Sequence, residues 1–187
     1  MSNTNTSLPP HALAFCKMFP EGRLCRFVNR RSGTLLDVRP DLNLASDEIP
    51  KVVCNPESVG VQYWIITPHG DGQAIIPVPR DGSFKVRYLT PSSLRNDVPV
   101  TVSPLPVSWI IFPTADSPKD NPLTPVSVPH GLYEEWTCEI SWPHFRNQSP
   151  CLLHLWYGSP DADTKVVLYP TDGGQWEFWQ VQFIRQD

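Results

Sequence analysis

One motif occurs three times along the chain, and this internal repeat restricts the fold more than any other feature. In each copy a short β-branched run ends near a proline, a turn follows, and a tryptophan leads into a second apolar strand. The three copies cover residues 51–56 with 62–66, 100–104 with 107–111, and 165–170 with 177–181. One such unit cannot bury its apolar face alone, so we expect three units to share one core around a pseudo-threefold axis.

Each unit also carries candidate strands upstream of this motif. Residues 32–38 align with 149–155 in the outer units, each preceded by a strand-like run at 24–28 or 137–141, and residues 84–89 alternate apolar and polar side chains in the middle unit. The pattern predicts about four strands per unit. The expected units span about 22–66, 67–112 and 132–187, in one β domain over 22–187, preceded by an N-terminal extension over 1–21.

Proline content supports an all-β chain with long loops. The sequence has 22 prolines in 187 residues, about twice the usual share. Because proline lacks the backbone N–H that a helix interior requires, this composition excludes a mostly helical protein. Five of the prolines lie in residues 113–131, a segment without apolar periodicity, which predicts a long proline-rich loop inserted in the third unit.

Charge and cysteine usage exclude several classes of protein. The net charge of −4 indicates no basic surface for nucleic acid. No apolar run approaches the ~20 residues that span a bilayer, and residues 1–10 lack the basic and apolar regions of a signal peptide. Five cysteines without a C-x-x-C pair favour reduced, buried thiols over disulfides or a zinc cluster. We therefore expect a cytoplasmic protein without membrane insertion, cofactor or metal site.

The repeat also has a recognisable sequence. Residues 32–38 read S-G-T-L-L-D-V, residues 62–64 read Q-Y-W, and the later copies keep Trp109 and Trp179 at the same place. The chain thereby resembles the ricin B-type lectin family over about residues 22–187, the proline-rich loop aside, and within it the cytosolic lectins of fungi. The resemblance implies an all-β chain with the β-trefoil fold, in which these tryptophans are core residues, and a non-catalytic protein that binds carbohydrate.

The resemblance further implies sugar-binding residues in each unit. In the family an aspartate in the D-V segment accepts hydrogen bonds from sugar hydroxyls, and an aromatic residue before the strand's proline stacks on the sugar ring. In the first unit these positions hold Asp37 and Asn55, with Gln62 beside them. In the middle unit Ser103 takes the aromatic position. Asp37 is equally suited to a local hydrogen bond near the turn.

The third unit reverses this pattern and is the stronger candidate. Its acceptor position holds His154 and its aromatic position Tyr169, with Gln175 and Trp176 beside them. Trp176 follows the Asp-Gly-Gly turn at 172–174, which favours an exposed indole on a loop. The alternatives are a structural histidine and a tyrosine used in packing. No unit combines the acidic acceptor with the stacking ring.

Two other functions compete with sugar binding. Scattered histidines and the lack of any nucleophile, zinc-protease or phosphate-binding motif predict that the chain is not an enzyme; a dyad of Cys151 with His144 or His154 is the one arrangement left open. The alternative is a β-trefoil protease inhibitor that presents the 113–131 loop, since prolines lower the entropic cost of ordering a recognition segment. A glycan or glycoconjugate is the expected partner, and a homodimer would add avidity.

Overall fold

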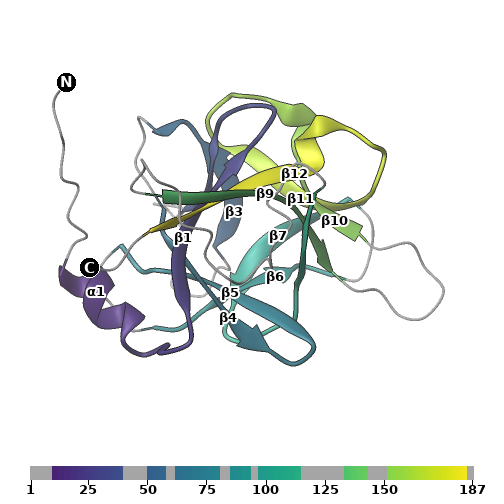
Figure 1. Cartoon of the computed structure of the whole chain (residues 1–187). Coiled ribbons are helices and arrows are strands. Elements are labelled where there is room, and N and C mark those ends of the chain that lie inside the picture. The colour runs from purple at the N-terminus through teal and green to yellow at the C-terminus, as the bar shows by residue number, and fades with distance from the viewer. Residues whose placement is uncertain are drawn as a thin grey trace, which may run out of the picture.

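Strands make up almost all the regular structure in the computed structural model (Figure 1), which describes residues 10–39, 50–57, 62–80, 85–93, 97–114, 133–142 and 151–184. The helical elements of this part are the helix α1 (Pro10–Cys16) and the short 3-10 turns η2 (Trp156–Gly158) and η3 (Gln175–Glu177). The strands are β1 (Arg23–Asn29), β2 (Leu35–Arg39), β3 (Lys51–Asn55), β4 (Trp64–His69), β5 (Gly72–Pro77), β6 (Tyr88–Pro91), β7 (Val98–Ser103), β8 (Ile110–Pro113), β9 (Tyr133–Trp142), β10 (Cys151–Leu155), β11 (Thr164–Pro170) and β12 (Phe178–Ile184).

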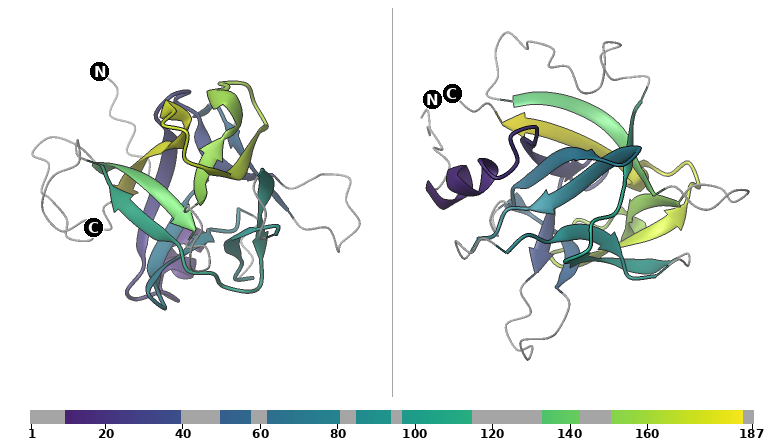
Figure 2. Two further views of the ribbon diagram at one scale, coloured as in Figure 1. Left: turned by 90° about the vertical axis from the view of Figure 1, so that its right-hand side faces the viewer. Right: turned by 90° about the horizontal axis from the view of Figure 1, so that it is seen from below.

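Six strands close into an antiparallel barrel. β1 pairs with β12 and β4, β4 with β5, and β9 with both β8 and β12. A bridge between Gln73 and Trp109 joins β5 to the start of β8 and completes the ring. Figure 2 shows the long β9 running beside β12, to which it pairs over seven positions. Closure leaves these strands without free edges.

Three hairpins pack together beside this barrel. They are β2–β3, β6–β7 and β10–β11. Their second strands also pair with one another, β3 with β7, β7 with β11, and β11 with β3. A triangle of pairings among three equivalent hairpins is the threefold arrangement that the repeat predicts, so the all-β expectation is confirmed.

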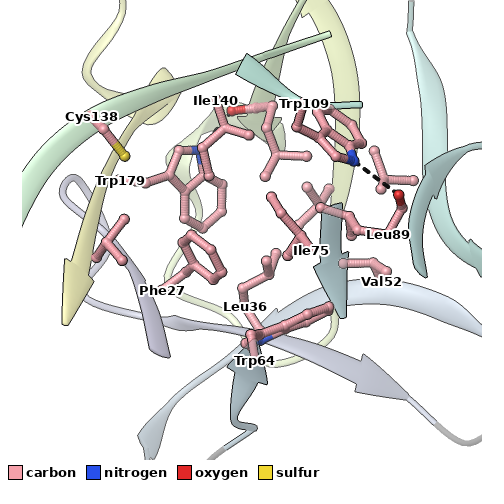
Figure 3. Close-up of a cluster of buried hydrophobic side chains, with 14 of the residues drawn as sticks. Phe27, Leu36, Val52, Trp64, Ile75, Leu89, Trp109, Cys138, Ile140 and Trp179 are labelled. Carbon is pink, nitrogen blue, oxygen red and sulfur yellow. Dashed lines mark hydrogen bonds between the residues drawn. The ribbon is translucent and has the colours of Figure 1, made fainter. Parts of the chain in front are cut away.

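The repeated tryptophans lie at the centre of the core (Figure 3), where Trp64, Trp109 and Trp179 are each 0% exposed. Each indole N–H donates a hydrogen bond to the carbonyl oxygen of a leucine in the same unit. The pairs are Trp64 with Leu36 at 3.0 Å, Trp109 with Leu89 at 2.9 Å, and Trp179 with Leu153 at 2.7 Å. The prediction that these tryptophans are core residues is confirmed, and the three bonds place Leu36, Leu89 and Leu153 at equivalent positions.

The helix α1 packs against the barrel. α1 begins at Pro10, where proline is tolerated because the first turn needs no donor there. Its Ala12 and Phe15 join a second apolar cluster with Leu24 of β1 and Ile65 of β4. None of the helices in the described residues is long and apolar enough to cross a membrane.

The structure can be compared with the sequence predictions for the cysteines and for two segments. All five cysteines are free and buried, as expected, and burial raises the pKa of each thiol. The strand predicted at 84–89 is displaced, because pairing with β7 begins at Tyr88. Of the proline-rich loop predicted at 113–131, only Pro113 and Thr114 belong to the described residues, so the rest of that prediction lies outside them.

Candidate functional site

The third unit has a surface pocket of about 200 Å³. Five segments build it: β10, η2, β11, the loop that leads into η3, and η3 itself. Its lining residues are His154, Leu155, Trp156, Tyr157, Val167, Tyr169, Asp172 and Trp176. The structure therefore brings together His154, Tyr169 and Trp176 from the sequence-predicted site and adds three polar or aromatic neighbours to them, Trp156, Tyr157 and Asp172.

Two tyrosines present aromatic surface at this pocket. Tyr169 is 39% exposed and Tyr157 is 78% exposed. Tyr157 has φ 51°, a left-handed conformation that is uncommon for a bulky residue, and its ring meets that of Trp156 edge-on at 4.7 Å between centroids. Such backbone strain concentrates at ligand sites. Sequence analysis did not identify Tyr157 as a site residue. Its positive φ depends on how η2 joins β10 to the following turn, which the sequence pattern does not reveal.

Lys165 packs over the ring of Trp156, which also lines the pocket. Lys165 Nζ lies 3.3 Å from the centroid of the Trp156 ring, in a cation–π contact. The same ammonium is 3.9 Å from Asp97 Oδ1. The cation–π contact ties β11 to η2 at the pocket wall, and the contact with Asp97 ties β11 to the turn before β7.

A buried hydrogen-bonded pair of side chains lies beneath the pocket. His154 Nε2 is 3.0 Å from Glu177 Oε2, and the Thr171 hydroxyl donates to both carboxylate oxygens of Glu177 at 3.0 and 3.1 Å. Burial lowers the pKa of His154, while the hydrogen bond and charge of Glu177 act in the opposite direction. The net direction favours a neutral imidazole, able to exchange hydrogen bonds with an uncharged ligand.

Trp176 is not the exposed loop indole that the sequence suggested. It is half-buried and packs against the main core. Its ring covers Gly174, where any side chain would collide with the indole, and its carbonyl oxygen accepts a hydrogen bond from Asn29 Nδ2 at 2.9 Å. The neighbouring Gln175 is exposed on η3 and is not part of the pocket lining.

In the first unit the predicted acceptor is already partnered. Asp37 is 2% exposed. Its Oδ2 accepts a hydrogen bond from Asn55 Nδ2 at 2.9 Å, and its Oδ1 lies 2.9 Å from Arg80 Nη2 in an ion pair that lacks hydrogen-bond geometry. Asn55 Oδ1 accepts the backbone N–H of Asp163 at 2.8 Å. These polar groups hold the first hairpin to the turn before β11.

Gln62 serves the backbone in a similar way. Its side-chain amide donates to the carbonyl oxygens of Tyr63 and Val78 at 2.6 and 2.9 Å. It also borders a second pocket, of about 320 Å³, that it shares with Arg80. In the middle unit the equivalent positions hold hydroxyl side chains, with Thr90 Oγ1 and Ser103 Oγ 3.1 Å apart.

The repeat alignment contained one signal that would have located the buried carboxylate. Glu177 stands two residues before Trp179, as Gln62 stands two residues before Trp64.

The catalytic dyad left open by the sequence lacks a reactive thiol: Cys151 is 1% exposed and burial raises its pKa, which disfavours the nucleophilic thiolate. The other partner considered, His144, lies outside the described residues.

Comparison with known proteins finds likeness at the level of structure. No protein-family model matches the chain, and no curated protein matches its sequence. A ricin B-like lectin from Macrolepiota procera, solved in complex with lactose, is 18% identical with a TM-score of 0.58 over 85% of this chain and 94% of that one. The Rhizoctonia solani agglutinin is 18% identical with a TM-score of 0.57, over 96% and 98%.

A third similar structure is a designed protein. ThreeFoil, a designed threefold-symmetric protein, is 18% identical with a TM-score of 0.53 over 87% of this chain and 99% of that one. Its symmetry matches the triangle of hairpins and the three equivalent indole hydrogen bonds. The strand pairing and these three likenesses together show that the chain has the β-trefoil fold found in ricin B-like lectins.

Proposed function

We propose that the chain is a non-catalytic carbohydrate-binding protein and that the third-unit pocket is its sugar site. The observation that carries the proposal is the pairing of exposed rings with hydrogen-bonding groups around one hollow, Tyr169 and Tyr157 beside His154 and Asp172. A pyranose has an apolar C–H face and a rim of hydroxyls. Aromatic rings suit the first and charged or polar side chains the second.

Each side chain of the pocket has a role in sugar binding that follows from its chemistry. Tyr169 offers the stacking face, since it stands before Pro170 on β11 and is half-exposed. Asp172 supplies a charged acceptor for hydroxyls, and the neutral His154 supplies a further hydrogen-bonding group at the floor. Trp156 and Trp176 form apolar walls. The lactose in the M. procera lectin makes a β-galactoside the first ligand to test.

The first unit is a weaker candidate for the same chemistry. A sugar hydroxyl would have to displace Asn55 or Arg80 from Asp37, whose carboxylate is already occupied by both. Gln62 would have to give up its bonds to backbone carbonyls. We therefore assign Asp37, Asn55 and Gln62 to a secondary site at most.

A glycan array followed by calorimetry on the best glycan and on lactose tests the proposal. Tyr169→Ala should weaken binding about tenfold or more, a loss of about 1.4 kcal/mol, because the stacking face is gone. Phe112→Ala is the matched control: Phe112 is an aromatic residue of β8 that is 48% exposed and does not line the pocket. Equal losses in both variants, or none in Tyr169→Ala, would contradict the assignment of the site.

The same experiment separates sugar binding from the alternative. A well-folded chain that binds no glycan but inhibits a cysteine or serine protease tightly would favour the inhibitor function of the 113–131 segment. The five free, buried thiols suit a reducing compartment, so we propose a cytoplasmic location. A homodimer, which would add avidity for multivalent glycans, is tested by sedimentation of the purified chain.

A further inference from the structure

We propose that His154, Asp172 and Glu177 form a binding site for one divalent transition-metal ion, with zinc as the expected metal. One imidazole nitrogen and two carboxylate oxygens, one from each residue, all lie within 4.8 Å of one another. The site goes beyond carbohydrate binding and does not depend on it, because the three ligand atoms belong to this chain alone.

The geometry of the buried pair is already close to that of two zinc ligands. Zinc bonds of 2.0–2.1 Å in a tetrahedral site place neighbouring ligand atoms about 3.3 Å apart. His154 Nε2 and Glu177 Oε2 are 3.0 Å apart, so a small separation of this pair admits the ion between them. The third ligand, Asp172, lies in the exposed loop before η3, with a carboxylate oxygen within 4.8 Å of the other two ligand atoms.

The charge at this place also favours a cation. The Glu177 side chain is 2% exposed, and its side-chain partners among the described residues are His154 and Thr171, neither of which carries a fixed positive charge. A buried carboxylate is costly unless it is paired. A dication between Glu177 and Asp172 offsets both negative charges.

Outer contacts hold two of the ligands in place, as they do in metal sites. The Thr171 hydroxyl donates to both oxygens of Glu177. The backbone N–H of Gly174 donates to Asp172 Oδ1 at 2.9 Å, which leaves Oδ2 for a metal. With three protein ligands, a tetrahedral zinc ion has a fourth position, and because His154 and Asp172 line the third-unit pocket, that position faces water or a bound ligand.

Calorimetric titration of the chelator-treated full chain with zinc chloride alone tests the site. We expect one zinc ion per chain, with weaker binding of calcium and magnesium chlorides, because an imidazole ligand favours zinc over these harder cations. Asp172→Asn should weaken zinc binding at least tenfold. Asp161→Asn is the matched control: Asp161 is also an exposed aspartate that accepts a local hydrogen bond, from Ser159, and its variant should bind zinc like the parent chain.

A second variant and a second readout complete the test. His154→Gln should also abolish binding at this site, and the ring resonances of His154 should shift on addition of one equivalent of zinc. Should His154→Gln fail to fold, judged by circular dichroism, Asp172→Asn still decides the question because its side chain is exposed. No zinc binding by the folded chain, or equal affinity in the parent, Asp172→Asn and Asp161→Asn chains, would overturn the proposal.

These titrations contain no sugar, so their outcome is separate from that of the proposed lectin function. Glycan binding is measured in parallel, once with chelator and once with one equivalent of zinc. A chain that binds glycan but no zinc contradicts the metal site alone. A chain that binds zinc but no glycan contradicts the lectin proposal alone.

Discussion

The first and third units place different side chains on the same framework. Asp37 and His154 both follow the leucine whose carbonyl accepts the buried indole N–H, and Asn55 and Tyr169 occupy matching positions on the partner strands. In the first unit these polar groups bond to each other and to Arg80. In the third unit they border an open hollow.

The residue two positions before the closing tryptophan contributes to this difference. Gln62 turns its amide to backbone carbonyls of Tyr63 and Val78. Glu177, at the same place in the third unit, instead takes His154 as its partner below the pocket. The comparison shows that equivalent positions in a repeat can bond to each other in one unit and line a surface pocket in another.

The largest expected effect is on the buried tryptophan that each of the three units contains. Replacing Trp64, Trp109 or Trp179 by alanine should lower the free energy of unfolding by about 3–5 kcal/mol in each case, because each leaves a core cavity. Urea denaturation followed by circular dichroism measures the loss. A much smaller loss in one unit would show that its tryptophan is not equivalent to the other two.

The next prediction compares matching residues in the hairpins of the first and third units. Asn55→Ala should lower the free energy of unfolding by about 1–3 kcal/mol, because Asp37 Oδ2 and the N–H of Asp163 lose their partner, and glycan affinity should stay unchanged. Tyr169→Ala, at the matching position, should weaken glycan binding with little change in stability. Paired denaturation and calorimetry measure both; the reverse pattern would mean that the first unit binds the sugar.

A smaller effect concerns the wall of the third-unit pocket. Lys165→Ala removes the cation–π contact with Trp156 and should cost about 0.5–1 kcal/mol of stability, as such contacts do at exposed sites. Glycan affinity should fall about twofold to fivefold as the indole loses its support. Lys51→Ala, in the first unit's β3, serves as control for the loss of an exposed lysine, and an equal loss of glycan affinity there would argue against a role for the wall.

The smallest effect is an expected absence of reaction. Cys54 in the first hairpin and Cys151 in the third are 0% and 1% exposed, and burial raises the pKa of both thiols. Neither should be alkylated by iodoacetamide at pH 7.5 in the folded chain, whereas both should react in urea. Mass spectrometry of tryptic peptides distinguishes them. Selective labelling of Cys151 in the folded chain would show that the third hairpin opens more readily than the first.

Sequence reasoning predicted the scaffold better than the site. The tryptophan repeat located three core residues and the threefold set of hairpins, because local apolar patterns repeat wherever the same packing repeats. It placed His154 and Tyr169 at one end of the third unit, and the structure sets both in one pocket. It misjudged Trp176, since the glycine turn suggested exposure while the indole packs back onto Gly174.

What the sequence determined by itself is therefore the repeat and, through it, the core and the three hairpins. Tertiary structure decided which polar side chains bond to each other and which ones line the pocket. Asn55 bonds to Asp163 across 108 positions, a contact between two units that no spacing within one unit encodes, and Glu177 meets His154 across 23 positions within the third unit. The left-handed Tyr157 likewise depends on its surroundings. Whether a carboxylate faces a ligand or another side chain depends on segments that meet only when the chain closes on itself.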